Sequence, residues 1–240
     1  MSGHSKWAKT HRQKSLQDSK RGAVFTKLAN LITVAAKEGG GDPETNFKLR
    51  LAIEKARGSN MPKDNIERAI NRGTGEGKDE QVFEEITYEV ILPGGIYFII
   101  EALTDNKNRT VSDLKAILNR NNAQLGATNS AAWNFKRCGL IVLDGSDFSD
   151  EAELTMIDAG VEDIIKDEDS WELITSPTTL MPTAEKLKQA GLNISEASLV
   201  YLPNEEKIIE DEEEKEKLDK LYEAIDNLDD ISNLYTNAKW

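Results

Sequence analysis

The sequence predicts an α+β protein of three domains: an N-terminal three-helix domain and two α/β domains, one of which is ferredoxin-like (βαββαβ) and inserted into the other. Three observations support this fold class. The first part of the chain has only helical periodicity, the later part mixes strand and helix patterns, and the charge changes sign between them. Residues 1–78 contain sixteen Lys or Arg and eight Asp or Glu, whereas residues 79–240 contain fourteen and thirty-five. We therefore expect a basic helical domain joined to an acidic α/β part.

Three amphipathic helices are predicted in the N-terminal domain. Apolar residues recur at helical spacing over 23–38, and the three glycines that follow end this helix. Asp42 is placed to cap a second helix, which has a proline in its first turn and extends to about Gly58. A third helix opens at Pro62, and Gly73 lies just past its predicted end.

The periodicity changes to that of strands after a Gly-rich, charged linker at 73–80. Strand patterns at 88–92 and 96–103 flank a Pro-Gly-Gly turn and are typical of a hairpin. Thr110, with an acidic residue three positions later, resembles a capping box and predicts a helix to about Arg120. Further strand patterns are found at 132–136 and 139–143.

The following segment has the element order βαββαβ, which is that of a ferredoxin-like domain. Its strands are predicted at 140–143, 161–166, 171–175 and 197–202, and its helices near 150–159 and 182–190. An acidic stretch at 205–216 then begins a long helix, and 231–235 is a final strand. The hairpin and helix that follow the linker form an incomplete domain, which the C-terminal helix and strand could complete. The predicted domains are therefore 1–78, 82–137 together with 205–240, and an inserted 138–204.

The N-terminal arm, residues 1–21, is the strongest candidate for a binding site. The first twenty-seven residues contain seven Lys or Arg and one acid, Asp18, in a protein of net charge −13. Lys and Arg bind phosphate oxygens, and an aromatic side chain among them can stack on an unpaired base. The alternative is a solvated tail of ordinary charge. The predicted nucleic-acid-binding residues are Lys6, Trp7, Lys9, His11, Arg12, Lys14, Lys20, Arg21 and Lys27.

A second candidate is the stretch LTDNKNRT at 103–110, between a predicted strand and a predicted helix. Loops at strand ends often carry functional residues, and here Lys107 and Arg109 would make a secondary binding contact. Turn formation and helix capping explain the same residues equally well, because Asn and Asp favour both. The residues leave these two explanations open.

The composition argues against a catalytic or metal site. The chain has one cysteine, Cys138, and two histidines, His4 and His11, both in the arm. No disulfide and no cysteine-based zinc site can be built from one cysteine, and histidine catalysis in a packed cleft is not expected. Gly77-Lys78 lacks the Ser or Thr, and the preceding strand, that a phosphate-binding loop requires. We expect a protein that has no cofactor or metal and is not an enzyme.

The chain is expected to be cytoplasmic. No stretch approaches the roughly eighteen apolar residues of a membrane span, and the N-terminus lacks the apolar segment of a secretory signal. No membrane partner is expected, and the chain is predicted to be a monomer.

Several motifs together resemble a known protein family. They are GHSKW (3–7), QDSKRG (17–22), FTKL (25–28), GGGDPETN (39–46), NMPKDNIERAI (60–70), RGTG (72–75), LTDNKNRT (103–110), LVYLPNEE (199–206) and NLDDISNLY (227–235). With these motifs, which extend over nearly the whole chain, the sequence is similar to the YebC/PmpR family, a group that includes the mitochondrial translational activator of cytochrome c oxidase. The resemblance implies a helical N-terminal domain, two α/β domains and a role in gene expression without a catalytic reaction.

The resemblance leaves two functions open. Members are described as DNA-binding transcriptional regulators, and members are also tied to translation on the ribosome, including relief of stalling at proline-rich stretches. The expected partner is therefore nucleic acid, either DNA or ribosomal RNA and tRNA, with the ribosome as a wider partner. The lack of a clear helix-turn-helix pattern favours the ribosomal function. The acidic α/β domains are not expected to bind the same polyanion broadly, since like charges repel.

Overall fold

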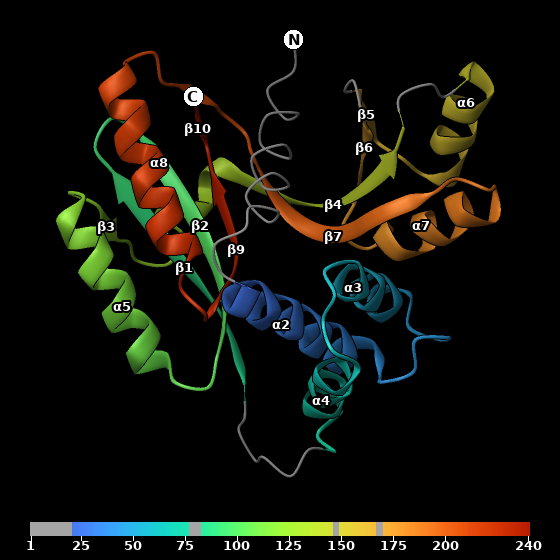
Figure 1. The fold of residues 1–240 in the computed structure, drawn as a ribbon. Coiled ribbons are helices and arrows are strands. Elements are labelled where there is room, and N and C mark those ends of the chain that lie inside the picture. The colour runs from blue at the N-terminus through green and yellow to red at the C-terminus, as the bar shows by residue number, and fades with distance from the viewer. Residues whose placement is uncertain (1–20, 77–82, 146–148, 167–169) are drawn as a thin grey trace.

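The computed structural model describes residues 21–76, 83–145, 149–166 and 170–240. They form a helical domain and two α/β domains (Figure 1), which confirms the predicted fold class. The helical domain consists of α2 (Arg21–Gly39), α3 (Phe47–Gly58) and α4 (Lys63–Thr74). Within the described residues, no helix combines the length and the apolar composition that crossing a bilayer requires.

The three helices of the first domain enclose a small apolar core, to which each contributes one face. Its fully or nearly buried side chains include Leu28, Ile32, Leu49, Ile53 and Ile66. The predicted cap of the second helix was wrong. Asp42 instead accepts a hydrogen bond from the Glu44 amide within a turn, and Asn46 caps α3 by accepting from the Leu49 amide. Asn46 is favoured because its side-chain amide also donates to the carbonyls of Ala35 and Gly40, which ties α3 to the end of α2.

Gly73 does not end the third helix, contrary to the sequence prediction. It lies inside α4, and the helix is capped by Gly75, whose φ of 75° is in the left-handed region. A Cβ at Gly73 would lie 2.7 Å from the Cβ of Ala36 and closer still to the carbonyl oxygen of Thr33. Gly73 is therefore required by the close approach of α4 to α2, not by helix termination.

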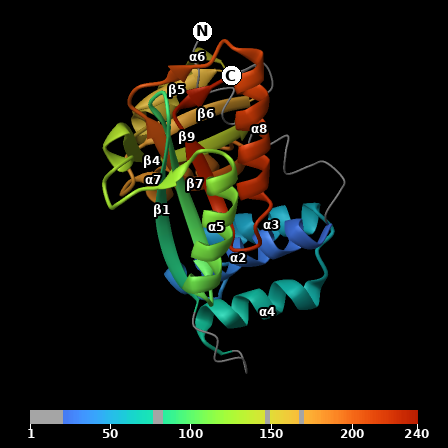
Figure 2. The same cartoon turned by 90° about the vertical axis from the view of Figure 1, so that its left-hand side faces the viewer.

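The second domain is a four-stranded antiparallel sheet in the order β3-β1-β2-β9. Its strands are β1 (Glu84–Leu92), β2 (Ile96–Thr104), β3 (Gln124–Leu125) and β9 (Ile231–Thr236). Helices α5 (Lys107–Arg120) and α8 (Glu212–Asp226) pack on one face of this sheet (Figure 2), and the short strands β8 (Lys207–Ile208) and β10 (Ala238–Lys239) pair beside it. Because β9 pairs with β2, the C-terminal segment completes the sheet that the hairpin begins.

Three local predictions in this domain were wrong. The helix predicted from Thr110 begins at Lys107 with Asn106 as its cap, because the Thr110 hydroxyl is used inside the domain. The strand predicted at 132–136 starts as a 3₁₀ helix (Ala132–Asn134), since the buried carboxylate of Glu89 binds successive backbone amides there. The long helix does not begin at 205 but at Glu212, after β8 has paired with the C-terminus.

The inserted domain has the sheet order β5-β6-β4-β7, with every neighbouring pair antiparallel, which is the ferredoxin-like arrangement. Its strands are β4 (Phe135–Asp144), β5 (Asp163–Lys166), β6 (Ser170–Thr175) and β7 (Ile194–Pro203), and its helices are α6 (Asp150–Ala159) and α7 (Leu180–Gln189). The single strand β4 replaces the two that were predicted at 132–136 and 139–143. The domain boundaries at 78, 137 and 204 stay a prediction.

The three domains share apolar contacts. Ile99 and Tyr235, on the face of the second-domain sheet opposite its helices, pack against Cys138 and Val200 of the inserted domain. Phe47, the first residue of α3, is only 5% exposed and belongs to the core of the inserted domain. Through the side chain of Phe47, the helical domain packs against the inserted domain.

Candidate nucleic-acid interface

Of the residues predicted in the arm, only Arg21 lies within the described part of the chain. Arg21 is the first residue of α2, where the description of the chain begins. The remaining arm residues lie outside the described ranges, and their role stays a prediction; they are Lys6, Trp7, Lys9, His11, Arg12, Lys14 and Lys20.

Lys27 contacts the second domain. Its ammonium group forms an ion pair with Asp226 at the end of α8, and the Asn30 side chain, one turn later, donates to the carbonyl of Asp229. These contacts hold α2 against the turn that precedes β9. Lys27 is only partly exposed, at 25% of its side chain, so a nucleic-acid phosphate would have to displace Asp226 in order to bind it. Its predicted role in binding remains untested.

Four further lysines of the helical domain are also paired with carboxylates. Lys48 and Lys63 pair with glutamates of their own domain, whereas Lys37 and Lys55 reach Glu85 and Glu196 of the other two domains; the pairs are Lys48–Glu38, Lys63–Glu67, Lys37–Glu85 and Lys55–Glu196. These ion pairs are largely exposed, and such pairs contribute at most about 1 kcal/mol each. A phosphate oxygen could therefore replace the carboxylate at little cost.

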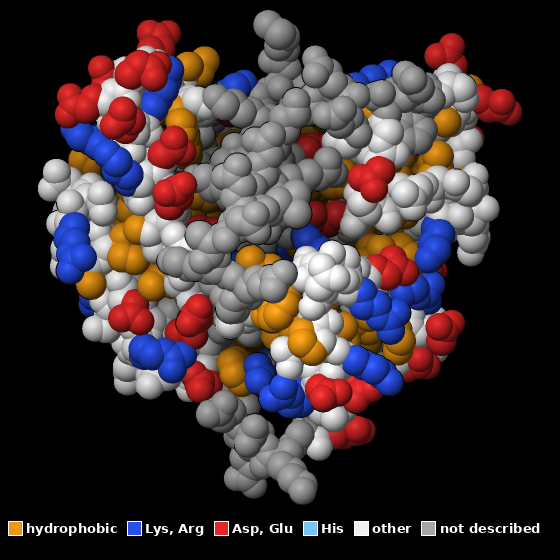
Figure 3. All heavy atoms as spheres, in the orientation of Figure 1, with side chains coloured by type: hydrophobic (Ala, Val, Ile, Leu, Met, Phe, Trp, Pro, Cys, Tyr) orange, Lys and Arg blue, Asp and Glu red, His pale blue; other side chains and the backbone are white. Residues whose placement is uncertain are grey.

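Three arginines of the helical domain are held in other ways. Arg50 donates to the carbonyls of Pro43 and Glu44, Arg68 donates to the Asp64 carbonyl, and Arg72 lies over the ring of Phe83 at 4.9 Å. A guanidinium group has five N–H donors, so each of these side chains retains donors for a phosphate. Figure 3 shows Lys and Arg side chains gathered on the face where α3 and α7 meet, and Asp and Glu side chains around α8.

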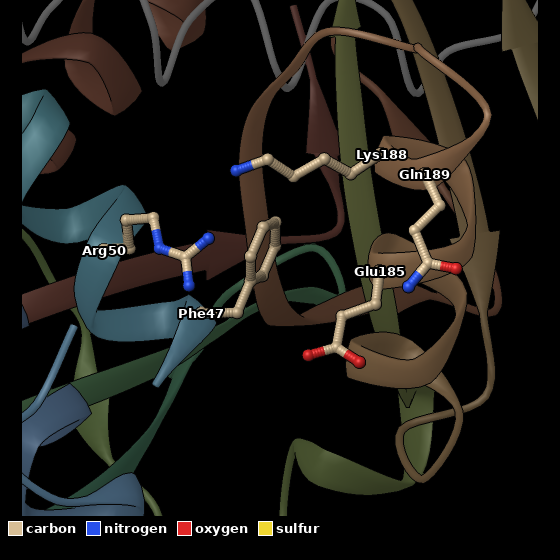
Figure 4. A pocket seen from close by; sticks show the side chains of 5 residues that line it. All are labelled: Phe47, Arg50, Glu185, Lys188 and Gln189. Carbon is tan, nitrogen blue, oxygen red and sulfur yellow. The ribbon is translucent and has the colours of Figure 1, made fainter. Parts of the chain in front are cut away.

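A groove of about 340 Å³ lies between α3 and α7 (Figure 4). It is lined by Phe47 and Arg50 of the helical domain and by Glu185, Lys188 and Gln189 of the inserted domain. The Arg50 guanidinium and the Lys188 ammonium lie 5.8 Å and 5.2 Å from the centroid of the Phe47 ring, so both make cation–π contacts with it. Two cations from different domains thus meet at one aromatic side chain.

The LTDNKNRT stretch mainly performs capping and pairing. Its Asn106 caps α5, and the Arg109 guanidinium binds Asp230 at 2.7 Å and Asp105 at 2.9 Å. The hydrogen bond to Asp230 is the largest cause of the raised pKa of Arg109. Lys107, at the start of the same helix, is exposed. The structure therefore supplies Arg109 with partners inside the chain, and the secondary contact predicted for Lys107 and Arg109 is not tested.

The single cysteine, Cys138, offers little chemistry. Cys138 is fully buried, and burial raises the pKa of its thiol to about 11. A thiol that stays protonated at neutral pH is a poor nucleophile. Within the described part of the chain, no three His, Cys, Asp or Glu side chains come together in a way that could hold a metal ion.

Sequence reasoning missed Lys188 as a potential binding residue. It is one of only three lysines in the acidic stretch 138–204, and nothing in its local sequence distinguishes it from a solvated helix residue. Only the packing of α7 beside α3 places it near the basic domain. The same holds for Asp226 and Glu196, whose pairing with Lys27 and Lys55 depends on how the domains meet.

Comparisons with known proteins cover nearly the whole chain. Residues 5–76 match the model of the TACO1/YebC protein N-terminal domain, and residues 83–238 match that of the TACO1/YebC second and third domain. A relative from Caldanaerobacter subterraneus is 46% identical over 100% of this chain and 98% of its own length. A relative from Lactobacillus acidophilus is 45% identical over 99% of this chain and 98% of its own. Both carry the name "Probable transcriptional regulatory protein".

A solved structure is similar to this chain in both sequence and fold. The crystal structure of a conserved hypothetical protein from Aquifex aeolicus is similar with a TM-score of 0.80 and 38% identity, over 92% of this chain and 91% of that one. The matched family models, the relatives and the fold agree across all three domains. The chain therefore belongs to the TACO1/YebC family.

Proposed function

We propose that this protein is a non-catalytic, nucleic-acid-binding regulator of gene expression, and specifically a DNA-binding transcriptional regulator of the YebC type. The observation that carries the proposal is the separation of charge along the chain. Residues 1–78 have a net charge of +8 and residues 79–240 one of −21. A basic domain at the front of an acidic protein is suited to a polyanion, because Lys and Arg displace the counterions that surround phosphates. The names of the relatives support the transcriptional role.

A ribosome-associated translation factor is the second candidate, and α4 favours it. A protein that reads duplex DNA usually lays a helix in the major groove, with side chains that contact base edges. The exposed face of α4 instead mixes charges, with Lys63 paired to Glu67 and Arg68 bonded to the Asp64 carbonyl and to Asn65. Such a surface suits phosphate contacts on irregularly folded RNA better than base readout. In either role the protein would act in the cytoplasm.

The salt dependence of binding tests whether the basic arm contacts phosphates. Binding would be measured by fluorescence anisotropy on a labelled DNA duplex and on a labelled single-stranded RNA, from low to moderate salt. Each phosphate contact contributes about −0.9 to the log–log slope on duplex DNA and about −0.7 on single strands. Neutralising six cations should flatten the slope on duplex DNA by up to about 5; these are Lys6, Lys9, Arg12, Lys14, Lys20 and Arg21.

A matched control is available on α8. Lys215, Lys217 and Lys220 lie among the many acidic residues of this helix, which repel a polyanion, so their neutralisation should leave the slope unchanged. An unchanged slope in the arm variant would refute its role in binding. Promoter footprints that survive moderate salt would support transcription, whereas co-sedimentation with ribosomes, lost in the arm variant, would support translation.

A further inference from the structure

The groove between α3 and α7 has the features of a built anion site. Its two cations come from different domains, Arg50 from the basic helical domain and Lys188 from the acidic inserted domain. Figure 4 shows their side chains converging beside the Phe47 ring, with the Glu185 carboxylate and the Gln189 amide farther along the groove. Phe47 itself is buried in the core of the inserted domain, so the meeting point of the two cations is anchored by packing.

Arg50 is held in place by backbone carbonyls, and no carboxylate of the described residues pairs with it. Its Nε and Nη2 atoms each donate to a backbone carbonyl at 2.8 Å, those of Pro43 and Glu44. These bonds immobilise the guanidinium plane and leave Nη1 without a hydrogen-bond partner among the described residues. An arginine fixed in this way loses little further freedom when it binds an oxyanion.

Lys188 is also left without a counter-charge among the described residues. Its ammonium group lies over Phe47, and no carboxylate, including that of Glu185, is within 4.0 Å. The stretch 138–204 contains fourteen acids and only two other lysines. Of those two, Lys166 pairs with Glu153 and Lys186 donates to the Ala159 carbonyl. An acid-rich domain thus presents one lysine toward an arginine of its neighbour.

Two positive charges that lie close together attract an anion to the space between them. Both cations contact one ring, so they are at most about 11 Å apart, close to one Debye length at moderate salt. At this separation their repulsion is only partly screened, and an oxyanion between them would be attracted by both. The groove is open to solvent and continues the basic surface of the helical domain, so it can admit a segment of a chain.

We propose that this groove binds a backbone phosphate of the nucleic acid, so that the inserted domain takes part in the interface through Lys188. This inference rests on the proposed function and names a second contact for it, beyond the arm. It departs from the expectation that the acidic domains are repelled by the polyanion. The fourteen acids of the stretch 138–204 still repel a polyanion, so the contact of this domain with nucleic acid is confined to the groove.

The test uses the full chain and compares two lysines of the same helix. Lys188→Gln should weaken binding to a labelled single-stranded RNA of twenty nucleotides about three- to tenfold at low salt and reduce the log–log slope by about 0.7. On a duplex DNA of the same length the slope should fall by about 0.9. The control Lys186→Gln makes the same charge change two residues away and should match wild type. Lys188→Arg keeps the charge and should retain binding.

The possible outcomes separate this inference from the proposed function. If wild type shows salt-dependent binding that needs the arm, but Lys188→Gln equals Lys186→Gln, the groove proposal is overturned and the function stands. If wild type binds neither probe, both fail. The proposal is also overturned if NMR shifts at Lys188 saturate with millimolar inorganic phosphate while Lys188→Gln binds RNA as tightly as wild type does. The groove would then be a site for a free anion. If polyglutamate binds as tightly as RNA does, and its binding also depends on Lys188, the proposal is overturned in favour of an acidic polypeptide.

Discussion

The packing of α4 on α2 depends on the absence of a side chain at Gly73, and Gly73→Ala should destabilise the helical domain. The new Cβ would lie 2.7 Å from the Ala36 Cβ and closer still to the Thr33 carbonyl, distances that no real Cβ tolerates. Thr33 cannot move easily, because its hydroxyl bonds across to the Ala69 carbonyl of α4. The clash is with backbone rather than with a flexible side chain, so the helices must separate.

The expected magnitude follows from two opposing effects. Overpacking of a close contact costs about 1–3 kcal/mol, and a backbone neighbour places this case in the upper part of that range. Replacing glycine by alanine inside a helix contributes about 1 kcal/mol in the opposite direction. We therefore expect a net loss of about 1–2 kcal/mol from the helical domain, equivalent to a roughly 5- to 30-fold larger open population.

Hydrogen exchange can measure this loss locally. Amides of α2 and α4 in Gly73→Ala should exchange about 5- to 30-fold faster than in wild type, with little change in the α/β domains. Gly58→Ala is the matched control, because no atom lies within 4 Å of the Cβ it would add at the end of α3. It should be neutral or slightly stabilising. Equal protection of α2 and α4 in Gly73→Ala and wild type would refute the steric explanation.

Three further predictions concern buried polar groups. Burial raises the pKa of Glu89 but hydrogen bonds from backbone amides lower it by more, so the stability that the carboxylate contributes is present at neutral pH and is lost as the pH falls through the lowered pKa. Glu89→Gln should therefore lower the free energy of unfolding by about 1–3 kcal/mol at pH 7, and the urea midpoints of variant and wild type should converge in acid. A difference between the midpoints that stays constant with pH would contradict this. Cys138, with its raised pKa, should resist iodoacetamide at pH 8 until urea unfolds the chain; rapid alkylation of the native protein would disprove its burial. Asp230→Ala removes the acceptor shared by Arg109 and the buried Thr110 hydroxyl and should destabilise the second domain by about 1–3 kcal/mol, a loss that an unchanged melting temperature would rule out.

The sequence predicted elements well where their signal is local and periodic. The hairpin of β1 and β2 and the βαββαβ order of the inserted domain follow from patterns within a few residues, and the structure has both. Helix ends were predicted less well. Asp42, Asn46, Asn106 and Thr110 all have side chains that can cap, and the choice among them depends on which side chain finds distant partners, such as Asp230 for Thr110.

The candidate site likewise has features that can be read from the sequence and features that depend on tertiary packing. The basic character of the N-terminal part is a property of composition, so it could be recognised from the residues before any fold was known. Which cations remain available for a phosphate is a property of contacts between domains. Among the described residues, Lys27 faces Asp226, Lys55 faces Glu196, and Lys188 faces a phenyl ring instead of an acid. Electrostatic attraction acts over distances in space, and only the packing of three domains sets those distances.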